Sequence, residues 1–266
     1  MSLSEKFDFA AEAIKIVEEA NKAGVLLRIM GATAIRIHCP NSVSLHKALG
    51  RELTDMDFIG YSKQREKIEK FFTQEFKYEI VKAALTPGLF VNRCIFFDKT
   101  GKKPHIDVFL DKLEMNHIID FRDRLDKDFP TIPLAELLLE KMQIVKINEK
   151  DIKDTIVLLV EHNLGDSDKE IINTEYIAKI LSKDWGFYYT VTTNLNKVKA
   201  FLERYEVLTN EQRKIVSDKI DKLLERIETE PKTLSWKIRA RIGPAKKWYN
   251  EVEEVERAEH LREPIR

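Results

Sequence analysis

The chain has 266 residues, and its 45 Lys and Arg residues balance 45 Asp and Glu residues, which gives a formal net charge of zero. A hydrophobic content of 43% is sufficient for a buried core and excludes a disordered chain, while 9 Gly and 8 Pro are too few for a collagen-like or linker-rich protein. A net charge of zero provides no overall field that would attract nucleic acid or a membrane surface.

The cysteines and the hydropathy pattern exclude two further classes of protein. Cys39 and Cys94 form no CxxC pair, so the sequence predicts neither a disulfide framework nor a cysteine zinc site. No window approaches the roughly 18 apolar residues of a membrane span, and the chain does not start with a secretory-signal pattern. We therefore expect a cytoplasmic protein without a membrane partner.

Apolar periodicity predicts helices and strands in alternation over the first half of the chain. In chain order we expect a helix over residues 4–23, a strand over 25–30, a short helix over 32–39, a loop over 40–54, a strand over 55–59, a helix over 62–76, strands over 78–85 and 89–97, a polar turn over 98–103 and a strand over 105–110.

The pattern changes in the second half of the chain. Helical periodicity is nearly continuous over residues 132–261, and no strand is evident there. The sequence therefore predicts an α+β fold, with a mixed sheet flanked by helices in a domain of residues 1–128 and an all-helical domain of residues 129–266.

Three aspartates lie on predicted strands. Asp55 and Asp57 flank Met56, and residues two apart in a strand point to the same face, with Cα atoms about 6–7 Å apart. Asp107 lies between Ile106 and Val108, which form the buried face of the last strand. Carboxylates inside apolar strands are costly unless they are paired or bind a metal, and oxygen ligands suit Mg²⁺. A single DxD is common, however, and an acidic residue at a strand end is often only solvated.

A glycine turn accompanies the aspartates. Gly31 follows the predicted strand of residues 25–30 and precedes a helix, and glycine allows the backbone to approach a ligand closely. A helix N-terminus attracts phosphate, and Thr33 adds a hydroxyl donor. The alternative is an ordinary strand-to-helix turn with Thr33 near the N-cap.

These motifs together resemble the nucleotidyltransferase superfamily of the DNA polymerase β type. The resemblance rests on Gly31-Ala32-Thr33-Ala34, Asp55-Met56-Asp57 and Ile106-Asp107-Val108 in this order, and it covers about residues 25–160. With the lead-in Arg51-Glu52-Leu53-Thr54, the pattern is most similar to abortive-infection-type and other minimal nucleotidyltransferases. Two features depart from the family pattern: Ala32 replaces the usual Gly or Ser, and the longer spacing from Gly31 to Asp55 indicates an inserted loop.

The resemblance implies transfer of a nucleoside monophosphate from an NTP to a hydroxyl group with two Mg²⁺ or Mn²⁺ ions. Asp55 and Asp57 would hold both metals. Asp107 would bind the metal near the nucleophile and could accept its proton, and Gly31 and Thr33 would face the triphosphate. The implied acceptors are a tRNA or another RNA, a protein or a small molecule.

Two basic residues are further candidates for phosphate contact. Lys141 is the only charged residue in the apolar stripe of the helix that follows the strands, so it either contacts the nucleotide phosphates or extends to solvent. Arg51 either contacts phosphate or substrate, or lies on the surface of a loop. Asp151 and Asp154 resemble a KDxxD signature of the abortive-infection relatives, although acidic residues are also favourable in the first turn of a helix.

Two alternative functions remain open from the sequence. The first is a nucleotide-binding or antitoxin-like module that keeps the fold without turnover. The second is an RNA-binding protein with a vestigial catalytic domain, because residues 231–249 combine basic residues with two tryptophans and carry no acidic residue. We favour packing of those tryptophans in the core, with the basic residues exposed.

Overall fold

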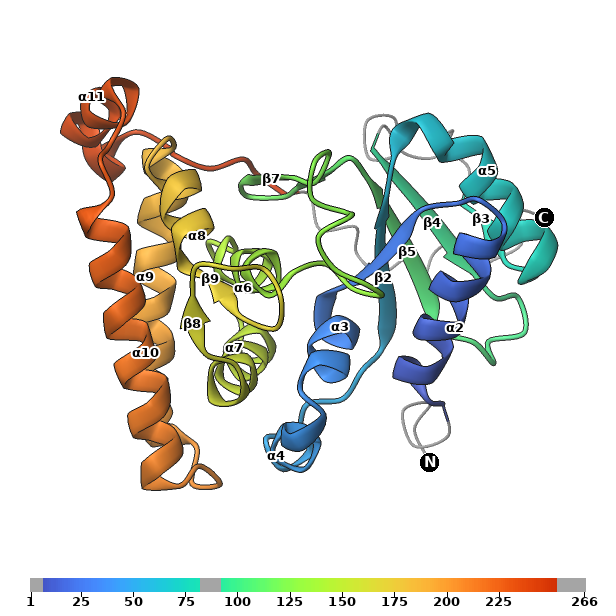
Figure 1. Ribbon diagram of the computed structural model, residues 1–266, viewed down its shortest axis with the longest axis horizontal. Helices are drawn as coiled ribbons and strands as arrows, with labels where there is room; N and C mark the ends of the chain where they lie inside the picture. Colours follow the sequence, from blue (N-terminus) through green and yellow to red (C-terminus); the bar gives the residue numbers. More distant parts are fainter. Residues whose placement is uncertain (1–6, 82–91, 253–266) are drawn as a thin grey trace, which may run out of the picture.

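The computed structural model describes residues 7–81 and 92–252 of the chain. Its first half contains a sheet and the helices around it (Figure 1). These elements are α2 (Phe9–Lys22), β1 (Leu27–Met30), α3 (Gly31–His38), η1 (Pro40–Ser42), α4 (Val43–Ala48), β2 (Asp55–Gly60), η2 (Ser62–Gln64), α5 (Arg65–Lys70), η3 (Phe71–Glu75), β3 (Glu79–Ile80), β4 (Arg93–Phe97), β5 (His105–Leu110), β6 (Lys112–Glu114) and β7 (Ile118–Asp120).

The second half is mainly helical and lies on one side of the sheet (Figure 1). Its elements are α6 (Leu134–Met142), α7 (Glu149–Glu161), β8 (Leu164–Gly165), β9 (Ile172–Asn173), α8 (Thr174–Leu181), α9 (Trp185–Phe201), η5 (Leu202–Arg204), α10 (Asn210–Thr229), α11 (Leu234–Ile242) and η6 (Gly243–Ala245). Together the two halves confirm the predicted α+β class, in which a mixed sheet flanked by helices is followed by helical segments.

The sheet is mixed, with the order β1-β2-β5-β4-β3 and with β6 and β7 extending from β5. Strand β2 is antiparallel to β1 and parallel to β5, while β4 is antiparallel to β5. The register between β2 and β5 pairs Asp57 with Asp107 and Met56 with Ile106. Because side chains alternate along a strand, the aspartates share one face and the apolar residues share the other.

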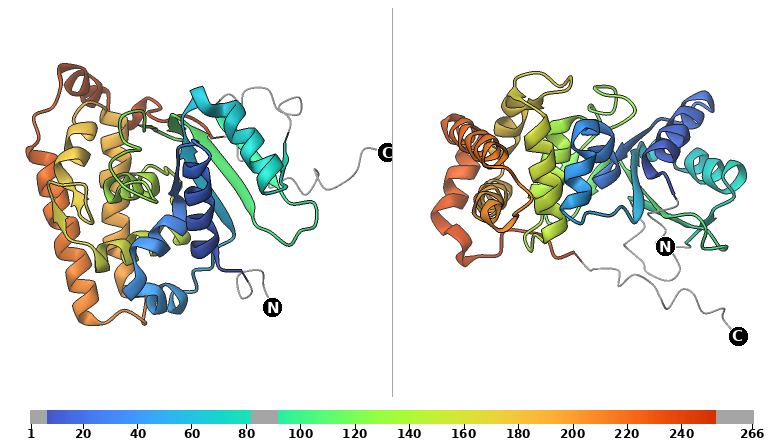
Figure 2. Two further views of the ribbon diagram at one scale, coloured as in Figure 1. Left: turned by 45° about the vertical axis from the view of Figure 1, so that its right-hand side comes forward. Right: turned by 90° about the horizontal axis from the view of Figure 1, so that it is seen from below.

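The apolar face of the sheet is covered by α2, α5 and η3 (Figure 2). Phe58 of β2 and Phe96 of β4 are fully buried, and both rings contact Phe72 of η3, with centroids 6.0 and 4.7 Å from its ring. Helices α2 and α5 lie on this side of the sheet, whereas α3 and the C-terminal helices lie on the other side (Figure 2, right). The face with the aspartates is therefore turned towards α3.

The two halves share one continuous hydrophobic core, which includes buried residues from α2 to α10. Helix α3 packs against β2 on one side and against α6 and α7 on the other. Residues near the junction also pair directly with the sheet, because the Ile132 amide donates to the Ile29 carbonyl at 3.0 Å. The boundary between residues 128 and 129 stays a prediction.

Some elements differ from the predicted ones for local reasons. The segment 40–54, predicted as a loop, contains η1 and α4, whose six residues are too few for a periodic pattern. The parallel pair β8 and β9 lies within the region predicted to contain no strand, and each has only two residues. Residues 4–6, 82–85, 89–91 and 253–261 of the predicted elements lie outside the described residues. Within the described part of the chain, no helix is long and apolar enough to span a membrane.

Candidate functional site

The acidic face of β2 and β5 brings together the three aspartates singled out in the sequence. Asp57 and Asp107 are partners in the strand register, and Asp55 lies two residues before Asp57 on the same face. Asp107 is buried, with 7% of its surface exposed, while Asp55 and Asp57 keep part of their surface open to solvent. The arrangement therefore gathers three carboxylates at one accessible place on the sheet.

Asp57 lies among other negative charges in a partly buried position. Burial, together with the negative charges of Asp55, Asp107 and Glu140, raises its pKa well above the usual value, and Lys141 opposes this increase only in part. Within residues 7–81 and 92–252, no hydrogen bond or ion pair reaches the Asp57 carboxylate. A cation placed near Asp57 would favour its charged form.

Asp107 has two basic neighbours that the sequence analysis did not assign to the site. Arg93 Nη2 donates to Asp107 Oδ2, and His105 Nε2 lies 3.4 Å from Asp107 Oδ1. Burial disfavours the ionised carboxylate, but His105 and Arg93 outweigh this effect and lower the pKa of Asp107. Arg93 and Asp107 project from neighbouring antiparallel strands, a pairing that residue spacing alone does not reveal. Asp57 and Asp107 thus ionise at different pH values although they are neighbours.

Gly31 connects β1 to α3 directly beside Asp57. Its φ angle is +70°, and a Cβ atom at this position would lie 2.5 Å from Asp57 Oδ2. Glycine is therefore required here both by the backbone conformation and by the close approach of the carboxylate. The Gly31 amide donates to Glu140 Oε2 at 3.1 Å, so this amide is already bonded. The backbone at Gly31 therefore makes a close approach, as expected for glycine, and the group that it approaches is the Asp57 carboxylate.

Thr33 supports the acidic strand from within α3. Its hydroxyl donates to the Asp55 carbonyl at 3.3 Å, and only 2% of its surface is exposed. The N-cap residue of α3, Met30, makes no side-chain capping bond, and the first-turn N–H groups of a helix lack partners within the helix; of these, the Gly31 amide is bonded by Glu140. Thr33 therefore links the helix start to the backbone of Asp55 in this structure.

Lys141 and Arg51 belong to a buried ionic network behind the aspartates. Lys141 Nζ lies 3.2 Å from Asp154 Oδ2, 3.6 Å from Asp151 Oδ1 and 3.9 Å from Glu140 Oε1. Arg51 donates to both Asp154 oxygens, at 2.9 and 3.1 Å, and is only 8% exposed. These contacts contradict two alternatives that the sequence left open. Arg51 does not lie on the surface of a loop, and Lys141 does not extend to solvent.

Asp154 is the centre of this network. His46 Nε2 lies 2.7 Å from Asp154 Oδ1, in addition to the contacts with Arg51 and Lys141. Burial opposes ionisation of Asp154, but Lys141, His46 and Arg51 outweigh it and hold its pKa well below the usual value. The sequence indicated Asp151 and Asp154 only through a short motif, whereas the structure places both inside the core between α6 and α7.

The residues around Asp57 fit a divalent cation. Carboxylate oxygens are the preferred ligands of Mg²⁺ and Mn²⁺, and the excess of negative charge at Asp57 would be relieved by such an ion. The ligands would be Asp55, Asp57 and Asp107. Asp107 would exchange part of its contact with Arg93 for the ion, since one carboxylate has two oxygens.

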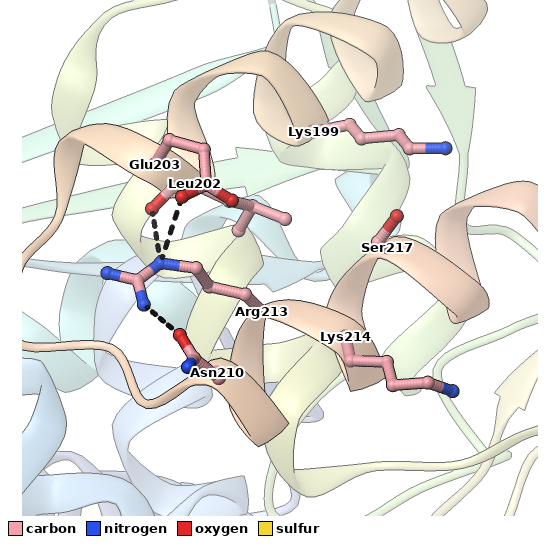
Figure 3. Close-up of a pocket in the computed structure, with 7 residues that line it drawn as sticks. All are labelled: Lys199, Leu202, Glu203, Asn210, Arg213, Lys214 and Ser217. Carbon is pink, nitrogen blue, oxygen red and sulfur yellow. Dashed lines mark hydrogen bonds and ion pairs between the residues drawn. The ribbon is translucent and has the colours of Figure 1, made fainter.

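A separate hollow lies between α9 and α10, far along the chain from the aspartates (Figure 3). Its basic residues already have partners: Lys199 Nζ lies 2.6 Å from both Asp221 oxygens, and Lys214 Nζ lies 2.8 Å from Asp218 Oδ2. The Arg213 guanidinium is turned towards Glu203 and Asn210 (Figure 3). Because its charges are balanced internally, this hollow is a poor site for an anionic ligand.

The tryptophans of the basic segment 231–249 pack against α9. Trp248 Nε1 donates to Thr190 Oγ1 at 3.0 Å, and Trp236 contacts Tyr188 edge to face, with ring centroids 5.1 Å apart. Both tryptophans are half-buried and lie outside the hydrophobic core, so they pack on α9 rather than in the core as predicted, and Lys237 is exposed as expected.

Comparisons with known proteins provide little guidance. No family model matches the chain, and no curated protein matches it. Among solved structures, the chain is similar to the crystal structure of an antigenic nucleotidyltransferase-like protein from Paracoccidioides brasiliensis, with 11% sequence identity over 85% of this chain and 95% of that chain. The TM-score is 0.36, a likeness too weak to carry an argument about function.

Proposed function

We propose that the protein is a nucleotidyltransferase that uses divalent cations to transfer a nucleoside monophosphate from an NTP to a hydroxyl group. The observation that carries this proposal is the convergence of Asp55, Asp57 and Asp107 beside the Gly31 turn, with a raised pKa at Asp57. Such a group of carboxylates suits a reaction that depends on charge neutralisation and positioning more than on covalent catalysis.

The residues have distinct roles in this proposal. Asp55 and Asp57 hold the divalent ions, which neutralise the charge of the phosphates and of the leaving pyrophosphate when they are bound. Asp107 acts as a ligand more than as a base, because its lowered pKa makes it a weak proton acceptor. Glu140 bonds the Gly31 amide and so fixes the turn next to Asp57.

The basic network supports the site indirectly. Lys141 balances Glu140 on one side and Asp154 on the other, so it reduces the negative charge near Asp57 without leaving the core. In this proposal Lys141 and Arg51 position α6 and the segment before β2, and phosphate contact falls to the start of α3.

The test is transfer of label from α-³²P-labelled NTPs in the presence of Mg²⁺ or Mn²⁺ and a panel of RNA, protein and small-molecule acceptors. We expect label transfer by the wild-type protein and by Asp218→Asn, whose carboxylate is exposed and lies on α10. We expect a loss of at least 100-fold in Asp57→Asn, the scale of removing a group that stabilises transition-state charge. Equal transfer by Asp57→Asn and the wild type would refute the mechanism.

Binding of a nucleotide without turnover is the second candidate. It is favoured by the contacts of Asp107 with Arg93 and His105, which place basic groups beside this carboxylate without a metal. Calorimetry and a pyrophosphate assay separate the two functions. NTP binding with no pyrophosphate release over the whole acceptor panel would favour the binding module.

A further inference from the structure

Three potential metal ligands from distant parts of the chain meet at the end of α3 opposite the aspartates. His38 ends α3, His162 caps the C-terminus of α7, and Glu170 lies in the loop between β8 and β9. Each offers one ligand atom, and these atoms all lie within 4.8 Å of one another. The seven residue steps from Gly31 to His38 correspond to about 10 Å of helix, so this cluster is separate from the acidic site.

The distances within the cluster agree with tetrahedral coordination. His38 Nδ1 lies 3.2 Å from Glu170 Oε1, and His162 Nδ1 lies 3.8 Å from Glu170 Oε2. Two ligands bound tetrahedrally to Zn²⁺ at about 2.0–2.1 Å are about 3.3 Å apart. The two imidazole rings are nearly perpendicular, with centroids 5.8 Å apart. Only small side-chain movements would bring the three atoms onto one ion.

The outer nitrogen of each ring is already held by the protein. His162 Nε2 lies 2.9 Å from the His38 carbonyl oxygen, which can only accept, so the ring donates from Nε2 and its Nδ1 faces Glu170. His38 Nε2 lies 2.6 Å from Thr131 Oγ1 and 3.4 Å from Asp128 Oδ2. Metal-binding histidines typically donate their other N–H to a carbonyl, hydroxyl or carboxylate in this way.

Both rings turn their Nδ1 atom towards the Glu170 side chain. An imidazole nitrogen that carries no proton has a lone pair that can bind a metal ion, and a carboxylate oxygen is a further ligand of the same ion. A cation between the three groups would therefore be bound by all of them. His38 and His162 are 7% and 6% exposed, whereas the Glu170 side chain is 57% exposed, so an ion could enter from the solvent side.

We propose that His38, His162 and Glu170 form a binding site for a divalent transition metal ion, with Zn²⁺ as its representative and water as the remaining ligand. Imidazole ligands favour Zn²⁺ over Mg²⁺, so this site differs in selectivity from the three aspartates. The bound ion fastens the β8–β9 loop to the ends of α3 and α7. This proposal does not depend on the nucleotidyltransferase activity.

The test is metal titration of the full-length protein without an affinity tag, after removal of metals with a chelator. We expect calorimetry to detect one Zn²⁺ site that Mg²⁺ does not occupy, and we expect Co²⁺ to produce the absorption bands of a tetrahedral site with nitrogen ligands. Glu170→Gln should weaken Zn²⁺ binding at least tenfold, and His162→Gln should abolish the Co²⁺ bands. Zn²⁺ should also raise the melting temperature of the wild type but not of Glu170→Gln.

Two control variants separate this site from other carboxylates. Asp166→Asn removes an exposed charge from the same loop and should bind Zn²⁺ like the wild type. Asp57→Asn should also retain the histidine site. Because Glu170 is exposed, its variant tests the proposal even if His162→Gln does not fold. The proposal is overturned if the wild type binds no Zn²⁺, if Glu170→Gln binds it equally well, or if Asp57→Asn alone abolishes binding.

Discussion

Replacing Asp57 by Asn should stabilise the metal-free protein and at the same time abolish its response to Mg²⁺. In the β2–β5 register Asp57 lies opposite Asp107, and the Cα atoms of neighbouring strands are about 5 Å apart. At an effective dielectric constant near 20, two unit charges at that distance repel each other by about 3 kcal/mol. Arg93 and Lys141 cancel part of this repulsion. We therefore expect the free energy of unfolding to increase by about 0.5–2 kcal/mol in Asp57→Asn.

The measurement is urea unfolding with and without Mg²⁺, at pH 7 and after removal of metals. A wild-type protein that binds Mg²⁺ should gain about 2.7 kcal/mol when the ion is present at 100 times its dissociation constant, because only the folded state binds it. The Asn variant should gain much less. The reasoning is refuted if Asp57→Asn is less stable than the wild type without metal, or if Mg²⁺ stabilises both proteins equally.

Three further predictions concern the turn, the buried network and the neighbour of Asp107. Gly31→Ala should lose about 1–2 kcal/mol of stability, because alanine is strained in the left-handed backbone conformation, and it should bind divalent ions more weakly, because its Cβ displaces Asp57. The control is Gly50→Ala, which has a φ of +69° and no atom within 4 Å of its Cβ and should keep its ion affinity in the same titration. Asp154→Asn should lower the free energy of unfolding in urea by about 3–5 kcal/mol, because Lys141 and Arg51 stay buried without a matching negative charge. The control Asp218→Asn removes an exposed carboxylate and should leave the urea midpoint unchanged. Arg93→Gln should tighten Mn²⁺ binding in calorimetry, because a cation that competes for Asp107 is removed; weaker binding would contradict this role.

The pH dependence of stability should reflect the lowered pKa of Asp154. A carboxyl group whose folded pKa lies below its unfolded value stabilises the protein above the unfolded pKa and loses this contribution as the pH falls towards the folded value. The wild type should therefore lose stability steeply below about pH 4, near the usual pKa of aspartate. Asp154→Asn should show a shallower decline in unfolding midpoints over the same range, and parallel curves would contradict the assignment.

The sequence was sufficient to predict the acidic face, because that face depends on local periodicity. Alternation along two short strands placed Asp55, Asp57 and Asp107 opposite the apolar residues, and the structure has this arrangement. Gly31 was recognised from its place between a predicted strand and a predicted helix, where glycine lets the backbone approach a neighbouring group closely. The roles of these residues stay predictions.

The partners of the charged residues could not be predicted, because they depend on contacts between distant segments. Arg51 and Asp154 are 103 positions apart, and His46 and Asp154 are 108 apart. Their pairing results from the packing of α4 and α7, and α4 itself was too short to be recognised. The cluster of His38, His162 and Glu170 was missed for the same reason. Spacing along the chain indicates which residues share a face of one element but not which elements meet.

Anomalous X-ray diffraction from crystals soaked in Mn²⁺ and a nonhydrolysable NTP tests the central claim most directly, because it locates the ion without relying on activity. We predict anomalous density between the carboxylates of Asp55, Asp57 and Asp107, next to the nucleotide phosphates. The absence of density there, with Arg93 still bound to Asp107 and the nucleotide elsewhere, would contradict the account.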